Sequence, residues 1–105
     1  MDDIDTDDGE VQIPEGAVAR RLPIVNRRGL HARASAKFVQ MVERYQSEVT
    51  VTRSGETVGG RSIMGLLTLG AAKGTSILVT ALGPDQDTCL DAIDALVANR
   101  FGEDE

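Results

Sequence analysis

The chain has 105 residues, of which 41% are hydrophobic and 27% are charged, which is enough for one folded domain with one core. It contains a single cysteine, Cys89, so a disulfide framework is excluded, and we expect this side chain to pack in a semi-buried position on the last helix. The first residues are acidic, and no run approaches the roughly 20 apolar residues that a membrane-spanning helix needs. We therefore expect a cytoplasmic protein without a signal peptide.

The net charge of −6 is unevenly distributed along the chain. Residues 1–15 hold seven acidic and no basic side chains, whereas residues 16–102 hold 11 basic and 7 acidic side chains, a net charge of +4. A block of like charges with low hydrophobicity is typical of disorder. We predict an acidic disordered tail over residues 1–17 and one mildly basic domain over residues 18–102.

The first half of that domain predicts a strand, a helix and a hairpin. Residues 19–26 predict a strand, and Pro23 favours an edge position for it. From residue 32 the apolar residues recur at helical spacing: Ala34, Phe38, Met41, Val42 and Tyr45. Residues 47–60 then alternate between apolar and polar around a turn at Ser54 and Gly55, which indicates a hairpin.

The second half predicts a helix, a strand and a helix. Residues 61–74 indicate a short helix with Ser62 at its N-cap and Gly70 or Gly74 at its end. The nearly continuous apolar run of residues 75–83 predicts a central strand. Residues 85–102 predict the last helix.

The resulting order, β-α-β-β-α-β-α, favours an α+β sandwich with one layer of helices. Each helix has one apolar stripe that it can bury against the sheet. We expect the other face of the sheet to be solvated, because the hairpin carries threonines at the alternate positions.

The stretch NRRGLHARASAKF contains the only histidine of the chain, His31, where the first strand gives way to the first helix. A helix start presents unpaired N–H groups and a partial positive charge, which together bind anions. Gly29 allows a sharp turn into the helix, and Arg33 is placed to hydrogen-bond an anionic group on the imidazole. Imidazole is a nucleophile that titrates near neutral pH, so His31 is a candidate for covalent phosphoryl chemistry.

Several alternatives compete at this position. A histidine before a helix is often only a surface or capping residue. A metal site is disfavoured, because one histidine and one distant cysteine do not make a ligand set. A hydrolase that used Ser35 would need an acidic partner that the pattern does not supply. Nucleic acid is a poor match as well, because aromatic residues make up 3% of the chain and no recognition motif is present.

Two motifs narrow the choice. GLHARASAKFV, followed about thirty residues later by GGRSIMGLLTLGAAKG, resembles the HPr family, the histidine-containing phosphocarrier proteins of the bacterial phosphoenolpyruvate-dependent phosphotransferase system. The resemblance runs from about residue 20 to residue 101. It implies an open-faced sandwich in which three helices cover one face of a four-stranded antiparallel sheet. It also implies a stoichiometric phosphoryl carrier rather than an enzyme, with no cofactor.

The resemblance assigns roles residue by residue. His31 would accept a phosphoryl group on Nδ1 from phosphorylated enzyme I and pass it to an EIIA-type protein, while Arg33 steadies the group. Ser62 matches the serine that HPr kinase/phosphorylase modifies in many bacteria. The family usually has proline where this chain has Ala34, which leaves an extra N–H in the first turn. The positions that match or adjoin the partner surface are Arg28, Ala32, Ile63, Met64 and Leu67.

Three readings of function stay open at this stage. The first is a phosphocarrier in the sugar-related or nitrogen-related branch: the end after Phe101 is similar to the nitrogen branch, and RSIMGLLTLG to the sugar branch. The second is a regulatory protein that acts mainly through phosphorylation of Ser62. The third is an unrelated ligand-binding module in which His31 only caps its helix. We expect a monomer, as suits a transient relay.

Overall fold

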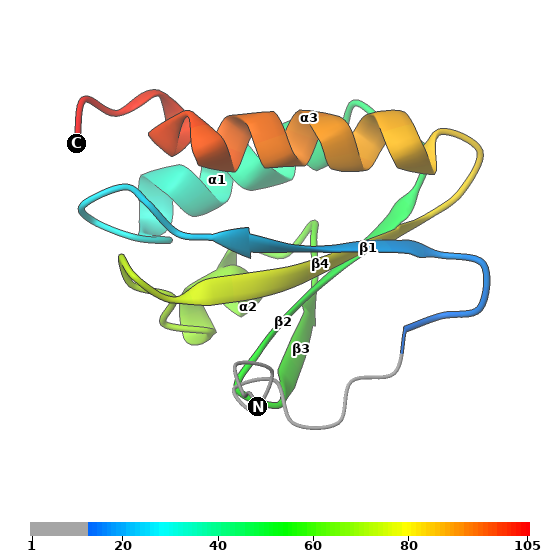
Figure 1. The fold of residues 1–105 in the computed structure, drawn as a ribbon, viewed down its shortest axis with the longest axis horizontal. Coiled ribbons are helices and arrows are strands. Elements are labelled where there is room, and N and C mark those ends of the chain that lie inside the picture. The colour runs from blue at the N-terminus through cyan, green and yellow to red at the C-terminus, as the bar shows by residue number, and fades with distance from the viewer. Residues whose placement is uncertain (1–12) are drawn as a thin grey trace.

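The computed structural model describes residues 13–105, which form a sheet and its helices (Figure 1). The elements in chain order are β1 (Val18–Pro23), α1 (Ala32–Val42), β2 (Glu48–Arg53), β3 (Glu56–Gly59), α2 (Ile63–Thr68), β4 (Ser76–Leu82), α3 (Gln86–Ala98) and a short 3-10 turn (Arg100–Gly102). The predicted order is therefore confirmed. Most of the predicted acidic tail lies outside the described residues, so its disorder stays a prediction.

The four strands form one antiparallel sheet in the order β1-β4-β2-β3. The apolar strand β4 lies between β1 and β2, as its sequence predicted, and β1 is an edge strand. Pro23 is the last residue of β1 and pairs with Ser76. The strand ends there, three residues earlier than predicted, because the following backbone turns toward residues 74 and 75 through Ile24.

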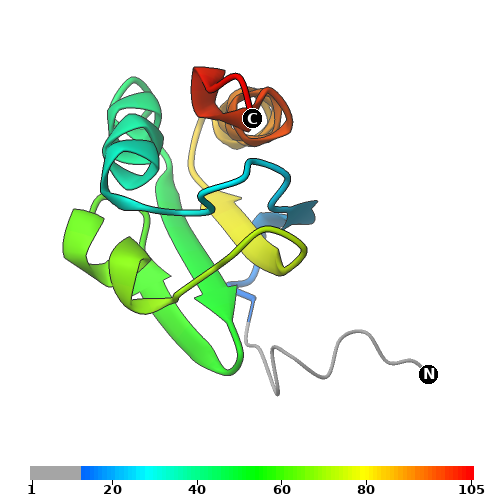
Figure 2. The same ribbon diagram turned by 90° about the vertical axis from the view of Figure 1, so that its left-hand side faces the viewer.

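All three helices cover one face of the sheet, as the view in which α1 and α3 are seen end-on shows (Figure 2). The core lies between the two layers, where the apolar stripe of α1 and that of α3 meet alternate residues of the strands. Its largest fully buried side chains are Phe38, Phe101, Leu22, Ile24, Leu66, Ile77, Leu90 and Ile93. Cys89 also packs in this core, and it is fully buried rather than semi-buried as predicted. The fold is the predicted open-faced α+β sandwich.

The outer face of the sheet differs from the solvated surface that we predicted. Thr52 and Thr80 lie on that face, yet each is only 2% exposed. Their hydroxyls pair across the strands, Thr52 with Thr57 at 2.7 Å and Thr80 with Thr50. These cross-strand hydrogen bonds satisfy the hydroxyls without water, so threonine periodicity overstated the exposure of this face.

Helix α2 is closed by Gly70, one of the two glycines predicted to end it, whereas α3 ends before its predicted limit. Helix α2 ends at Thr68, and the chain leaves it through Gly70 at φ +60°. Helix α3 ends at Ala98 rather than at Gly102, because Arg100 and Phe101 adopt φ values of +59° and +55°. Phe101 is fully buried, and its packing holds a backbone conformation that is rare for a residue with a side chain. The chain is thereby directed back toward the start of α1.

Candidate functional site

The conformation of the loop before α1 requires glycine at position 29, because a side chain there would clash with the neighbouring backbone. Gly29 adopts φ +67°, and a Cβ atom there would lie 2.5 Å from the carbonyl oxygen of Ala71. The adjacent Leu30 is buried, and its amide donates to the same Ala71 oxygen at 2.9 Å. The loop therefore packs tightly on the segment after α2, and this contact sets where the next residue, His31, begins the helix.

The buried side chain of Asn26 stabilises the loop before α1 through hydrogen bonds. Its side chain is fully buried, and Nδ2 donates to the carbonyl oxygen of Gly29 at 2.8 Å. The same Nδ2 donates to Oε1 of Glu103 at 3.0 Å, across 77 residues of sequence. Its Oδ1 atom is buried and has no hydrogen-bond partner among the described residues. Asn26 thus ties the loop before α1 to the segment after α3.

His31 is the N-cap residue of α1, with extended backbone angles. Its carbonyl accepts the amide of Ser35 at 2.8 Å, but its side chain makes no capping hydrogen bond. The imidazole Nε2 instead contacts Oε2 of Glu103. A purely capping role for the side chain therefore finds no support. Ser35 is buried and donates its hydroxyl to the carbonyl of Leu30 at 3.2 Å, so it is not poised as a nucleophile.

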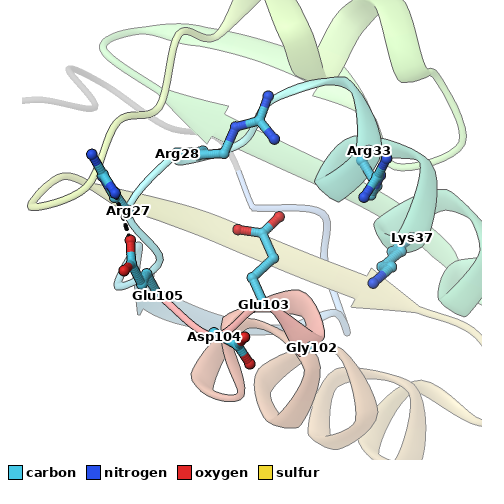
Figure 3. Close-up of a pocket in the computed structure, with 8 residues that line it drawn as sticks. All are labelled: Arg27, Arg28, Arg33, Lys37, Gly102, Glu103, Asp104 and Glu105. Carbon is cyan, nitrogen blue, oxygen red and sulfur yellow. Dashed lines mark hydrogen bonds and ion pairs between the residues drawn. The ribbon is translucent and has the colours of Figure 1, made fainter.

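Beside this contact lies an open hollow of about 680 Å³ in which basic and acidic side chains face one another (Figure 3). We call it the basic pocket. Its lining residues are Arg27, Arg28, Arg33, Lys37, Gly102, Glu103, Asp104 and Glu105. The cations come from the loop before α1 and from its first turns, and the acids come from residues 103–105.

The segment that carries the three acids, residues 103–105, is held by contacts with the loop before α1 and with α1 itself. Arg27 donates to Oε1 of Glu105 at 2.6 Å, and its backbone amide donates to the Glu105 carbonyl. Lys37 donates to the carbonyl of Phe101 at 2.8 Å. Within residues 13–105, Arg33 makes no hydrogen bond or ion pair. Its guanidinium therefore keeps its donors available for an anion that enters the pocket.

Glu103 is the carboxylate nearest the histidine. Its side chain is 19% exposed and that of His31 is 16% exposed. Burial alone would raise the pKa of Glu103, but the hydrogen bonds from Asn26 and His31 outweigh it and hold this pKa below its ordinary value. Glu103 is therefore ionised at neutral pH and acts as a hydrogen-bond acceptor toward the imidazole.

The other predicted site residues gather around α2. Ser62 is exposed at the N-cap of α2, and its hydroxyl accepts the amide of Gly65 at 2.9 Å, as predicted for a cap. Met64 is 72% exposed and Ile63 is 39% exposed, whereas Leu67 is half-buried. The patch that presents apolar surface therefore centres on Met64. Arg28 is exposed and lines the basic pocket, and Ala32 is exposed as the first residue of α1.

Sequence reasoning did not assign the residues that complete the site, namely Asn26, Lys37, Phe101 and Glu103. The available signal was the departure from helical pattern at the end of the chain, where Phe101 precedes a glycine and three acids. The described residues contain no group of three or more histidine, cysteine or acidic side chains that could hold a metal ion. None of the described helices is long and apolar enough to cross a membrane.

Comparison with known proteins assigns the family. A family model described as "PTS HPr component phosphorylation site" matches residues 18–99. Phosphocarrier protein HPr of Cupriavidus necator is 45% identical over 86 residues, which are 82% of this chain and 97% of that protein. Phosphocarrier protein HPr of Pseudomonas aeruginosa is 44% identical over 88 residues, 83% of this chain and 98% of that protein.

A solved structure of an HPr protein is also similar to this chain in fold and in sequence. The crystal structure of HPr-C-His from Thermoanaerobacter tengcongensis has a TM-score of 0.80 and 33% identity, and covers 84% of this chain and 99% of that one. An open-faced sandwich with a histidine at the start of its first helix defines the class of small phosphocarrier folds. The chain belongs to the HPr family of phosphocarrier proteins of the phosphotransferase system.

Proposed function

We propose that His31 is the phosphoryl acceptor of this carrier, which takes the group from phosphorylated enzyme I and passes it to an EIIA-type protein. The observation that carries the proposal is the position of His31: its ring leaves the start of α1 beside the basic pocket and is not used as a cap. The guanidinium of Arg33 and the first amides of α1, none of which has a hydrogen-bond partner within residues 13–105, are suited to the oxygens of a phosphoryl group.

The transfer needs little from the protein beyond position and charge. An imidazole nitrogen attacks phosphorus and forms a nitrogen–phosphorus bond. The bond between phosphorus and the donor group of enzyme I breaks, and its electron pair stays on that donor. Arg33 stabilises the equatorial oxygens while the group is between the two proteins. Passage to the EIIA-type protein repeats the same displacement with this chain as the donor.

We further propose that both partners dock against α2, whose side chains Ile63 and Met64 are exposed. A basic rim around an apolar centre favours rapid, transient association with acidic partners. The protein would act in the cytoplasm as a monomer. The features of the two branches are mixed in this chain, so the proposal covers the sugar-related and the nitrogen-related branch alike.

The test is the intact mass of the purified protein after incubation with phosphoenolpyruvate, Mg²⁺ and enzyme I of the same organism. We expect one acid-labile phosphoryl group on the native chain and none on His31→Ala. Circular dichroism of the variant establishes that it is folded. A native chain that stays unmodified with competent enzyme I, or a His31→Ala variant that is modified equally, would refute the proposal.

A second, regulatory function is favoured by the exposed hydroxyl of Ser62 next to Met64. Phosphate at a helix N-terminus is compatible with the helix dipole, so the fold should persist. The added charge would weaken docking, because it lies at the edge of the apolar patch. Incubation with HPr kinase/phosphorylase and ATP should give an acid-stable phosphate on the native chain that Ser62→Ala lacks. Absence of that phosphate would remove the regulatory function and leave the carrier function intact.

A further inference from the structure

The carboxylate of Glu103 meets the imidazole of His31 on the edge that carries Nε2. Glu103 lies after the 3-10 turn, beyond residues 18–99 that the family model matches. Its other oxygen, Oε1, accepts Nδ2 of the buried Asn26 at 3.0 Å. The carboxylate is therefore held on both oxygens, and its position relative to the histidine is set by the core rather than by solvent.

This contact distinguishes the two ring nitrogens. An ionised carboxylate has only acceptors, so it pairs with Nε2 when that nitrogen carries the hydrogen. In the neutral ring the lone pair is then on Nδ1. Among the described residues, Nδ1 has no hydrogen-bond partner, so this lone pair is not engaged by the protein. The contact that separates the two ring nitrogens thus comes from a residue 72 positions away in the chain.

We propose that Glu103 is a positioning residue for the transfer: it holds His31 in the Nε2–H tautomer, with Nδ1 directed to the incoming phosphorus, and balances the charge of the phosphorylated ring. The inference rests on the proposed function of His31. When the Nδ1–phosphorus bond forms, the ring nitrogen gives its electron pair and the imidazole becomes cationic. The hydrogen stays on Nε2, where the Glu103 carboxylate faces it, so no proton has to leave during the transfer.

In the same geometry the charged side chains of the basic pocket have different roles. Arg33 has no partner in the part of the chain that the structure describes, and it is available to the phosphoryl oxygens. Glu105 is paired with Arg27, and this pair fastens the segment that carries Glu103. A hydrogen-bonded carboxylate behind a histidine is the arrangement that orients the base in catalytic triads. Here it would serve a nucleophile that is itself the histidine.

The experiment compares the native chain with Glu103→Ala and Glu103→Gln, and with Glu56→Gln as a matched control on an exposed hairpin residue outside the pocket. The first readout is the ¹⁵N chemical shifts of the His31 ring between about pH 5 and pH 9. An imidazole ordinarily changes its charge within this range. We expect the Nε2–H form to predominate in the native chain and in Glu56→Gln. We expect a mixture of the two tautomers in Glu103→Ala.

The second readout is the single-turnover rate of phosphorylation by phosphorylated enzyme I. We expect it to fall about tenfold in Glu103→Ala, by analogy with the low end of the loss when the hydrogen-bond partner of a metal-bound histidine is removed. Glu103→Gln should recover part of this loss, since its amide oxygen can still accept from Nε2. Glu56→Gln should match the native rate.

The tautomer measurement requires no enzyme I, so it judges the inference separately from the proposed function. A native chain that is never phosphorylated refutes the carrier proposal and, with it, the transfer role of Glu103. A phosphorylated native chain whose tautomer is unchanged in Glu103→Ala overturns the inference alone. A faster transfer in Glu103→Ala also overturns it, because Glu103 would then shield the ring rather than position it.

Discussion

Nζ of Lys37 donates to the carbonyl oxygen of Phe101 at 2.8 Å, and so joins the second turn of α1 to the turn that follows α3. The carbonyl belongs to a residue whose side chain is fully buried and whose φ is +55°. The backbone after α3 is thereby held from two sides, by the aromatic ring in the core and by the ammonium at the pocket. Glu103 follows two residues later, so the packing of Phe101 and the hydrogen bond from Lys37 together fix its position.

Replacement of Phe101 by alanine tests this arrangement. Removing a fully buried phenylalanine leaves a cavity and costs about 3–5 kcal/mol of unfolding free energy. Denaturant unfolding at neutral pH measures the loss. The His31 ring shifts should also move toward those of Glu103→Ala, because the segment loses its anchor. Retention of native ring shifts in a folded Phe101→Ala variant would show that Lys37 and Asn26 suffice to hold Glu103.

A second prediction compares substitutions at Gly29 and Gly70. Both adopt left-handed backbone angles, φ +67° and φ +60°, but a Cβ at Gly70 meets nothing within 4 Å. Gly70→Ala should therefore cost only the backbone conformation, about 1–2 kcal/mol. Gly29→Ala adds a clash with the Ala71 carbonyl, so the loop before α1 must shift.

The measurement is thermal unfolding of both variants, together with the rate of phosphorylation by enzyme I. Gly29→Ala should lose more stability than Gly70→Ala and should also slow phosphorylation, because the start of α1 moves. Gly70→Ala should be phosphorylated at the native rate. Equal losses of stability in the two variants would contradict the close approach of Gly29 to Ala71.

Much of the fold could be predicted from the sequence, because the strands and helices are coded by local hydrophobic periodicity. The helical spacing of Phe38 and Val42, both fully buried, identified α1, and the apolar run of β4 identified the central strand. His31 and Ser62 were found through short motifs at helix starts. Each of these signals lies within about fifteen residues of sequence.

The partners of His31 could not be predicted in the same way. Glu103 lies 72 residues from His31 and 77 residues from Asn26, and its neighbours are acids that on their own are typical of a solvated chain end. Its placement depends on the left-handed turn at Phe101, a conformation that the core imposes on a residue with no local preference for it. Tertiary packing, rather than a motif, completes the site.

Asp85 predicts how stability responds to acid. Its carboxylate accepts the Ser47 hydroxyl at 2.7 Å and the amide of Gln46 at 2.9 Å, and these hydrogen bonds lower the pKa of Asp85 below its ordinary value. A lowered native pKa adds stability that is present above the unfolded-state pKa and is lost as the pH falls through the native pKa. The loss is therefore expected on the acid side of the ordinary range of an aspartate, near and below pH 3.8.

The comparison is denaturant unfolding of the native chain and of Asp85→Asn from neutral pH down to about pH 2, around and below the ordinary aspartate pKa. We expect Asp85→Asn to be less stable at neutral pH, and the difference to shrink as the pH falls. Asp87→Asn, an exposed substitution in the first turn of the same helix, is the control. Curves for the native chain and Asp85→Asn that stay parallel throughout would contradict the role of these hydrogen bonds.

Ser62 allows the cap and the docking surface to be separated. Ser62→Ala removes the acceptor for the Gly65 amide and should cost about 1 kcal/mol, with little effect on partner binding. Ser62→Asp can still cap the helix but adds a negative charge beside Met64. We expect it to keep native stability and to weaken the binding of enzyme I in titration calorimetry. Equal affinities for the two variants would mean that partners do not approach α2 from this side.

Arg33 provides the most direct test of the charge in the basic pocket, because no other described residue competes for its guanidinium. Removing one donor that stabilises charge in a transfer reaction commonly slows it about 10²–10³-fold. We expect losses toward the low end for Arg33→Ala, since the first amides of α1 and the neighbouring Arg28 remain. Arg33→Lys should recover only part of the rate, because an ammonium cannot form two parallel hydrogen bonds.

Stopped mixing with phosphorylated enzyme I gives the rate, and titration with unphosphorylated enzyme I gives the affinity. If Arg33 acts on the phosphoryl group, the rate should fall much more than the affinity. An affinity that falls by the same factor as the rate would assign Arg33 to docking instead. The ¹⁵N shifts of His31 should stay native in both Arg33 variants, since Arg33 makes no hydrogen bond with the ring, and this separates its role from that of Glu103.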